Sequence, residues 1–165
     1  IWMSARIHKM AATTAGILFA LYAVLNGVTM SFIFLVYAME SIATTFLITA
    51  GTFGAMTLVG YTTKKDLSAL GRTLMMLLIG LIIATLVNLF VASSGLAVIL
   101  NYAGVLIFVG LTAYDTQKIK QQVEYASATG DEEQTTKLAL MGSLTLYLDF
   151  INLFLYLLRI FGGRR

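Results

Sequence analysis

The sequence contains no cysteine, no proline and a single histidine, His8, among its 165 residues. The missing cysteines exclude a disulfide framework and a thiolate metal site, and one histidine excludes a metal centre that needs several. Charge is also scarce, because only 12% of the residues are charged, about half the share usual in soluble domains. This composition excludes a soluble enzyme domain and a disordered chain. Without proline, helices can run uninterrupted.

Hydrophobic residues are abundant instead: they make up 59% of the chain, and the mean hydropathy is +0.87. A helix needs about 20 apolar residues to cross a membrane, and the uncharged runs reach that length. A turn signal, Ser93-Ser94-Gly95, divides the longest run. We therefore predict an all-α polytopic membrane helix bundle forming a single transmembrane domain, residues 1–165. Its spans are expected at about 10–39, 41–63, 73–92, 96–117 and 138–160.

Basic residues occur at every second loop, which the positive-inside rule assigns to the cytoplasm. They are Arg6 and Lys9, then Lys64, Lys65 and Arg72, then Lys118, Lys120 and Lys137. The net charge of +3 therefore indicates orientation in a membrane rather than nucleic-acid binding. Five crossings would put Arg164 and Arg165 outside, against the rule. Either the last segment is re-entrant, or the earlier loops outvote these two charges.

Small residues at helical spacing predict packing faces, because apolar burial does not drive helices together in lipid. They occur in the first three spans, at Gly16, Ala20, Ala23, Gly27, Gly51, Ala55, Gly80 and Ala84. We interpret them as helix contacts rather than as a ligand site.

The last span carries a polar stripe, which must face protein or water because lipid cannot solvate it. Its members follow at steps of three and four: Gly142, Thr145, Asp149, Asn152, Tyr156 and Arg159. This pattern predicts a central helix surrounded by the others. The fourth span offers a partner face at the same spacing: Asn101, Gly104, Phe108, Thr112 and Asp115.

Asp149 lies in the middle of an apolar run, where a charged aspartate costs about 3 kcal/mol. Either it is a protonated structural group bonded to a neighbouring helix, or it belongs to an ion path or proton sensor, which we favour. Asp115 fits a solvated helix end and a functional group equally well. Glu40 fits a plain loop charge better than a cation-attracting mouth. Arg159 is about 15 Å along the helix from Asp149, too far to neutralise it.

If Asp115 and Asp149 meet, their titration is coupled and they can share one proton. Loss of that proton would create repulsion and move the last helix, which is a mechanism for a pH-gated pore. No catalytic motif is visible, so we do not expect an enzyme. Intramembrane aspartyl proteases also use two aspartates, but their second one sits in a Gly-Asp context that neither Asp115 nor Asp149 has.

Three stretches resemble the Bax inhibitor family, in a bacterial-type member. They are Thr63–Ser68 with Leu70-Gly71, Ala113–Ile119 (Ala-Tyr-Asp-Thr-Gln-Lys-Ile) and Leu144–Phe154 (Leu-Thr-Leu-Tyr-Leu-Asp-Phe-Ile-Asn-Leu-Phe). The resemblance implies seven helices, six around a central seventh. This chain would then lack the first span and most of the second.

The resemblance also implies a pH-sensitive calcium leak whose paired sensor aspartates are Asp115 and Asp149. In the family, an arginine after the second span helps to latch this pair. The aligned position here is Ser4, with Arg6 two residues on. The family's suppression of cell death in eukaryotes is not carried over to a bacterium.

We therefore expect a pH-regulated cation leak with calcium as the favoured ion, in a bacterial inner membrane. Asp115 and Asp149 would form the sensor and line a calcium path, with support from Thr112, Asn152, Tyr156, Arg159, Arg6 and Glu40. No cofactor is expected beyond permeant calcium; the partners are the bilayer, protons and other membrane proteins. One rival is an interaction protein that regulates a membrane protease or a stress or cell-death pathway without flux. Another is a proton-coupled transporter.

Overall fold

The computed structural model describes residues 11–163, and every element in that range is an α-helix. Five helices are long and apolar enough to cross a membrane, the first of them continuing through a short helical turn. The bounds are α2 (Ala12–Met30), α3 (Ile33–Val36), α4 (Met39–Thr62), α5 (Ser68–Val91), α6 (Ser94–Ala128) and α7 (Glu132–Phe161). The predicted all-helical membrane bundle is confirmed.

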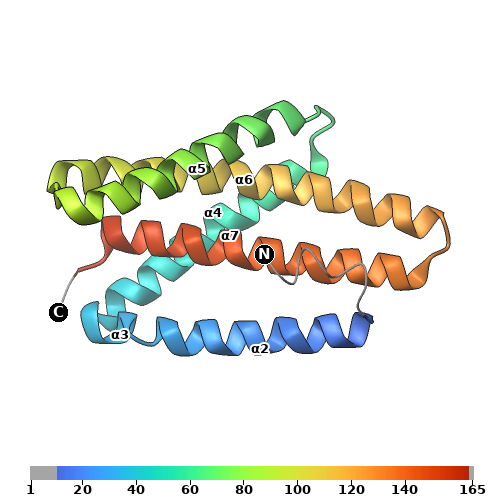
Figure 1. Cartoon of the computed structure of the whole chain (residues 1–165), viewed down its shortest axis with the longest axis horizontal. Coiled ribbons are helices and arrows are strands. Elements are labelled where there is room, and N and C mark those ends of the chain that lie inside the picture. The colour runs from blue at the N-terminus through green and yellow to red at the C-terminus, as the bar shows by residue number, and fades with distance from the viewer. Residues whose placement is uncertain (1–10, 164–165) are drawn as a thin grey trace.

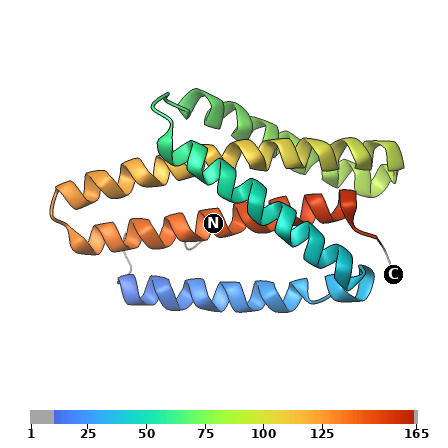
Figure 2. The same ribbon diagram turned by 180° about the vertical axis from the view of Figure 1, so that it is seen from behind.

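An antiparallel hairpin of α6 and α7 forms the centre of the bundle (Figure 1). The helix α5 lies along α6, and α2 lies along α7 on the other side. From behind, α4 crosses both helices of the hairpin obliquely (Figure 2). Extensive contacts of α2, α4 and α5 are therefore made only with α6 or α7 within residues 11–163. The last helix shares the central place with α6.

The termini of α7 lie at opposite ends of the bundle (Figure 1). At its end, the Gly163 carbonyl accepts from the Ala38 N–H at 3.0 Å, and the Gly163 N–H donates to Ser41 Oγ at 3.0 Å. Both bonds join the end of α7 to the start of α4. The helix of 30 residues is unbroken and about 45 Å long, which exceeds the apolar core of a bilayer, about 30 Å. This length is sufficient for a full crossing.

Side chains at the helix starts explain where α6 and α7 begin. Ser93 Oγ accepts from the Leu96 N–H at 3.3 Å, and Asp131 Oδ1 accepts from the Gln134 N–H at 2.9 Å. Such caps satisfy backbone donors that have no partner inside the helix. Before Ser93, Ala92 takes a left-handed conformation with φ 52° and turns the chain between α5 and α6. The turn lies at Ala92 and Ser93, so only the first residue of the predicted Ser93-Ser94-Gly95 signal is in it, and Ser94 and Gly95 begin α6.

The predicted packing faces were wrong at several glycines. Gly16, Gly27, Gly51 and Gly80 have open space where a Cβ atom would stand, within the part of the chain described. The close approaches occur elsewhere. A Cβ on Gly60 of α4 would overlap the Ala113 carbonyl group of α6.

Candidate functional site

Two buried aspartates on the central hairpin lie against each other. Asp115 of α6 is 7% exposed and Asp149 of α7 is 5% exposed. Their carboxyl groups are close enough to share a hydrogen bond. An ionised carboxylate has no donor, so such a bond requires that one partner carries a proton. Within residues 11–163, no N–H or hydroxyl group donates to Asp149 Oδ2.

Contacts along the hairpin set the register that brings these aspartates together. The Tyr156 ring packs where a Cβ on Gly104 would stand, at 2.6 Å, and stacks on Phe108 with 5.9 Å between centroids. Towards the other end, Ile119 packs on Gly142. The polar stripe of the last span thus meets the partner face predicted on the fourth.

A cavity of about 340 Å³ adjoins the aspartate pair. Thr145, Asn152 and Tyr156 line it on α7, and apolar side chains of α5 close another side: Met75, Leu78 and Ile82. Asp115 and Thr145 also line a second cavity of about 190 Å³, which includes Lys118 and Gln122. Asp115 therefore lies between two cavities, and Asp149 lines the larger of them.

A third cavity, about 350 Å³, lies beyond Tyr156. Tyr156 lines both this cavity and the one at the aspartates, and Arg159, Asn88 and Asn101 line the third cavity alone. The exposed Arg159 guanidinium lies 5.3 Å from the centroid of the Tyr156 ring. The three cavities thus follow one another along the polar stripe.

The remaining predicted residues have other surroundings. Thr112 is fully buried, but its hydroxyl donates to the Phe108 carbonyl at 2.7 Å, and it lines none of the three cavities. Asn152 Nδ2 donates to the Leu148 carbonyl at 2.8 Å. Glu40 is exposed in the first turn of α4, at the end of the bundle where α7 finishes. Ser4, Arg6 and His8 lie outside the described residues.

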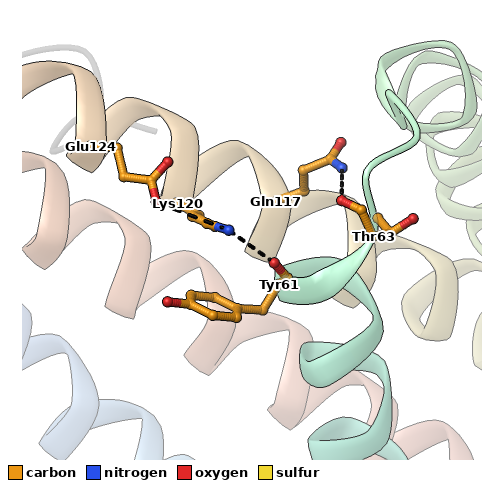
Figure 3. Close-up of polar contacts among 5 residues, drawn as sticks. All are labelled: Tyr61, Thr63, Gln117, Lys120 and Glu124. Carbon is orange, nitrogen blue, oxygen red and sulfur yellow. Dashed lines mark hydrogen bonds and ion pairs between the residues drawn. The ribbon is translucent and has the colours of Figure 1, made fainter.

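Sequence reasoning missed one buried polar residue, Gln117 of α6, which holds the connection between α4 and α5. Its Oε1 accepts from the Leu67 N–H at 2.9 Å, and its Nε2 donates to the Lys65 carbonyl at 2.8 Å. Its Nε2 also donates to the Thr63 carbonyl at 3.4 Å (Figure 3). The signal was present, because Gln117 lies two positions after Asp115 in the same motif and so points to a different face of the helix.

The α4–α5 connection also contains Asp66, which starts α5. Its Oδ1 accepts from the Ser68 N–H at 2.9 Å. Hydrogen bonds from the Ser68 side chain and backbone lower the pKa of the Asp66 carboxyl below its ordinary 3.8. Asp66 therefore stays ionised, and its carboxylate is bonded to the first residue of α5, the helix that follows it.

The aspartate pair is too small a ligand set for a resident cation. Residues 11–163 hold no group of three or more histidine, cysteine, aspartate or glutamate side chains suited to a metal. Calcium takes six to eight oxygen ligands, and the two carboxyl groups supply at most four.

The sequence model of the family described as "Inhibitor of apoptosis-promoting Bax1" matches residues 1–165. The chain belongs to the Bax inhibitor family. The family resemblance carried by the three motifs is therefore confirmed, and the chain is a multi-pass membrane protein.

Relatives within this Bax inhibitor family come from diverse bacteria. "Inner membrane protein YbhL" of Escherichia coli (strain K12) is 55% identical over 165 residues, which are 100% of this chain and 70% of YbhL. A protein of Rickettsia prowazekii is 51% identical over 157 residues, 95% of this chain and 65% of its own length. A membrane protein of Streptococcus pyogenes is 43% identical over 145 residues, 88% of this chain and 62% of its own length.

Proposed function

We propose that this protein is a pH-sensitive cation leak of the bacterial inner membrane, with calcium as the favoured ion. The observation that carries the proposal is the buried pair Asp115–Asp149: both carboxyl groups line one cavity, Asp115 also lines a second, and no N–H or hydroxyl group among residues 11–163 donates to Asp149 Oδ2. Buried ionisable groups in membrane helices are costly and mark ion or proton pathways.

The proposed gate is the contact between α6 and α7 at the two aspartates. With one shared proton the carboxyl groups bond, and the hairpin stays closed at this level. When that proton leaves, two negative charges repel in a poorly solvated site and attract a cation. Lys118 is the basic group whose charge acts on Asp115. Separation of the helices would join the cavities that Asp115 now divides.

Calcium efflux from proteoliposomes at pH 6, 7 and 8 tests this proposal. We expect a leak above that of empty liposomes that rises with pH, because deprotonation opens the contact. Asp115→Asn and Asp149→Asn should each make the leak independent of pH over this range. Asp131→Asn is the matched control, because this capping residue lies outside the pair, and it should keep the pH dependence.

Each contrary result has a distinct meaning. A leak that falls with rising pH but still depends on both aspartates would retain the sensor and overturn gating by repulsion. A leak that depends on pH equally in all variants would remove the sensor role. The absence of flux, with folding verified by circular dichroism, would overturn the channel.

A second candidate is a membrane interaction protein without flux, regulating a membrane protease or a stress pathway. Two observations favour it: the family's description names an inhibitor, and α6, with 35 residues, is about 52 Å long. That length leaves part of the α6–α7 hairpin beyond a bilayer core of about 30 Å, where a partner could contact it. A folded protein without flux would leave this candidate standing.

A further inference from the structure

A basic pocket lies where α4 ends against α6, away from the aspartate pair. Its volume is about 360 Å³, and its lining includes Lys64, Lys65 and Lys120 together with Tyr61 and Gln117. The lysines come from two segments far apart in the sequence, the α4–α5 connection and the C-terminal part of α6. The pocket is not part of the cavities along the polar stripe.

The pocket is held in shape before any ligand binds. The three bonds of Gln117, which is 7% exposed, fix the backbone that carries Lys64 and Lys65. Lys120 Nζ donates to the Tyr61 carbonyl at 3.1 Å and lies 4.4 Å from the centroid of the Tyr61 ring (Figure 3). A pre-organised site loses little conformational entropy when a ligand binds.

The charges of the pocket favour an anion. Among the described residues, neither Lys64 nor Lys65 has a carboxylate within 4.0 Å. Of the two acidic residues in the lining, Asp66 is bonded to Ser68 at the start of α5. Glu124 is exposed, and its carboxylate is 4.0 Å from Lys120 Nζ, which is the longest distance that still counts as an ion pair. Two exposed ammonium groups therefore remain without a counter-charge from residues 11–163.

The depth of the pocket matches the headgroup layer of a membrane. It adjoins the end of α4, whose apolar span finishes at Thr62. Leu58 and Tyr61 in this last turn are 65% and 55% exposed, so apolar surface lies beside the lysines. The positive-inside rule places this loop in the cytoplasm, and basic pockets between helices on that side bind anionic headgroups.

We propose that this pocket binds the phosphate of an anionic phospholipid in the cytoplasmic leaflet, with Lys64 and Lys65 as its principal ligands and Lys120 as a third. The acyl chains would lie along the exposed face of α4 near Leu58. This site is separate from the proposed gate, so it stands or falls independently of ion flux.

Native mass spectrometry of the delipidated full chain in a neutral detergent tests the proposal. Phosphatidylglycerol and phosphatidylcholine with identical acyl chains are titrated against the wild type, and we expect clear preference for phosphatidylglycerol. Each lysine near an anionic surface contributes about fivefold in affinity, so Lys64→Gln with Lys65→Gln should weaken phosphatidylglycerol binding about 30-fold. Phosphatidylcholine binding should be unchanged.

Two controls separate charge at this site from charge in general. Lys137→Gln removes a lysine paired with Glu133 at 2.8 Å on α7, and it should keep the preference. Lys64→Arg with Lys65→Arg keeps both charges and should bind like the wild type. A wild type without preference, or a glutamine variant that keeps it, overturns the proposal. Competition by millimolar inorganic phosphate would overturn the lipid assignment and indicate a free-phosphate site.

Discussion

Several helices of the described residues approach one another closely at single glycines. Gly60 lies against the Ala113 backbone, and Gly104 lies under the Tyr156 ring. A methyl group at Gly60 would meet backbone atoms, which cannot rotate away as a side chain can. By contrast, Gly51 on the same helix has nothing within 4 Å of a built Cβ. Gly51 and Gly60 of α4 therefore have different roles.

Gly60→Ala should destabilise the protein by about 1–3 kcal/mol, because overpacking forces the backbones of α4 and α6 apart. Gly51→Ala is the matched control and should be neutral or stabilising by up to about 1 kcal/mol, since alanine favours a helix interior over glycine. The free energy of unfolding in mixed micelles, followed by circular dichroism, measures both. Equal effects of the two substitutions would contradict this close contact.

The sequence predicted the pairing of polar residues better than the packing of small ones. Asp115 and Asp149 belong to faces with helical spacing, and a polar face in an apolar helix has few places to go. Glycines such as Gly16 and Gly80 carry no comparable constraint, because a glycine is tolerated towards lipid and towards protein alike. Which glycines make contacts depends on where helices cross, and spacing along one helix does not contain that information.

At the scale of elements, Gln117 ties three segments together. Its side chain serves one backbone donor and two backbone acceptors of the connection that follows α4. The connection has no regular structure of its own, so these bonds fix where α5 begins relative to α6. A buried amide with several partners is costly to replace, because removing it leaves buried backbone groups unsatisfied.

Gln117→Leu should destabilise the protein by about 1–3 kcal/mol and raise amide hydrogen exchange at Leu67, whose N–H loses its acceptor. Gln122→Leu, one turn further along α6 and exposed, should change neither. Hydrogen-exchange mass spectrometry over the peptide containing residues 63–68 provides the measurement. Unchanged exchange in the Gln117 variant would show that the connection is held by other contacts.

The bounds of the helices differ from the predicted spans for a physical reason. Charges marked the ends of the spans, but a helix can continue after it leaves the apolar layer. The helix α5, which contains the third predicted span, begins at Ser68 rather than at residue 73, and Arg72 lies inside it. Helices α6 and α7 continue through the charged residues between Lys118 and Lys137 to a short turn at Gly130. Hydropathy indicates which residues lie in the apolar layer of the membrane, whereas capping residues indicate where a helix begins.

At the scale of the whole molecule, the helix order fixes which connections share a side of the membrane. The contact of Lys120 with Tyr61 places the end of α4 beside the C-terminal part of α6. The bonds of Gly163 place the end of α7 beside the start of α4. Basic loops therefore cluster at one end of the bundle, as the positive-inside rule predicts.

Single cysteines can test this topology cleanly, because the chain has none of its own. A membrane-impermeant maleimide should label Ser94→Cys, at the first residue of α6, in intact cells from outside. Ser127→Cys, near the α6–α7 turn, should react only after permeabilisation. Both positions are exposed, so burial does not confound the result. The reverse pattern would invert the orientation and move the basic pocket to the outer leaflet.

The pattern of helix contacts has a consequence for biosynthesis. Within residues 11–163, α2, α4 and α5 pack extensively only against α6 or α7, which the ribosome makes after them. At about 5–20 residues per second, some 4–14 seconds separate the completion of α5 from that of α7. During that interval α2, α4 and α5 lie in the bilayer without their packing partners. They are then accessible to membrane proteases and to insertion chaperones. The surfaces of α2, α4 and α5 that contact the α6–α7 hairpin therefore stay exposed to proteases and chaperones until this hairpin has been translated.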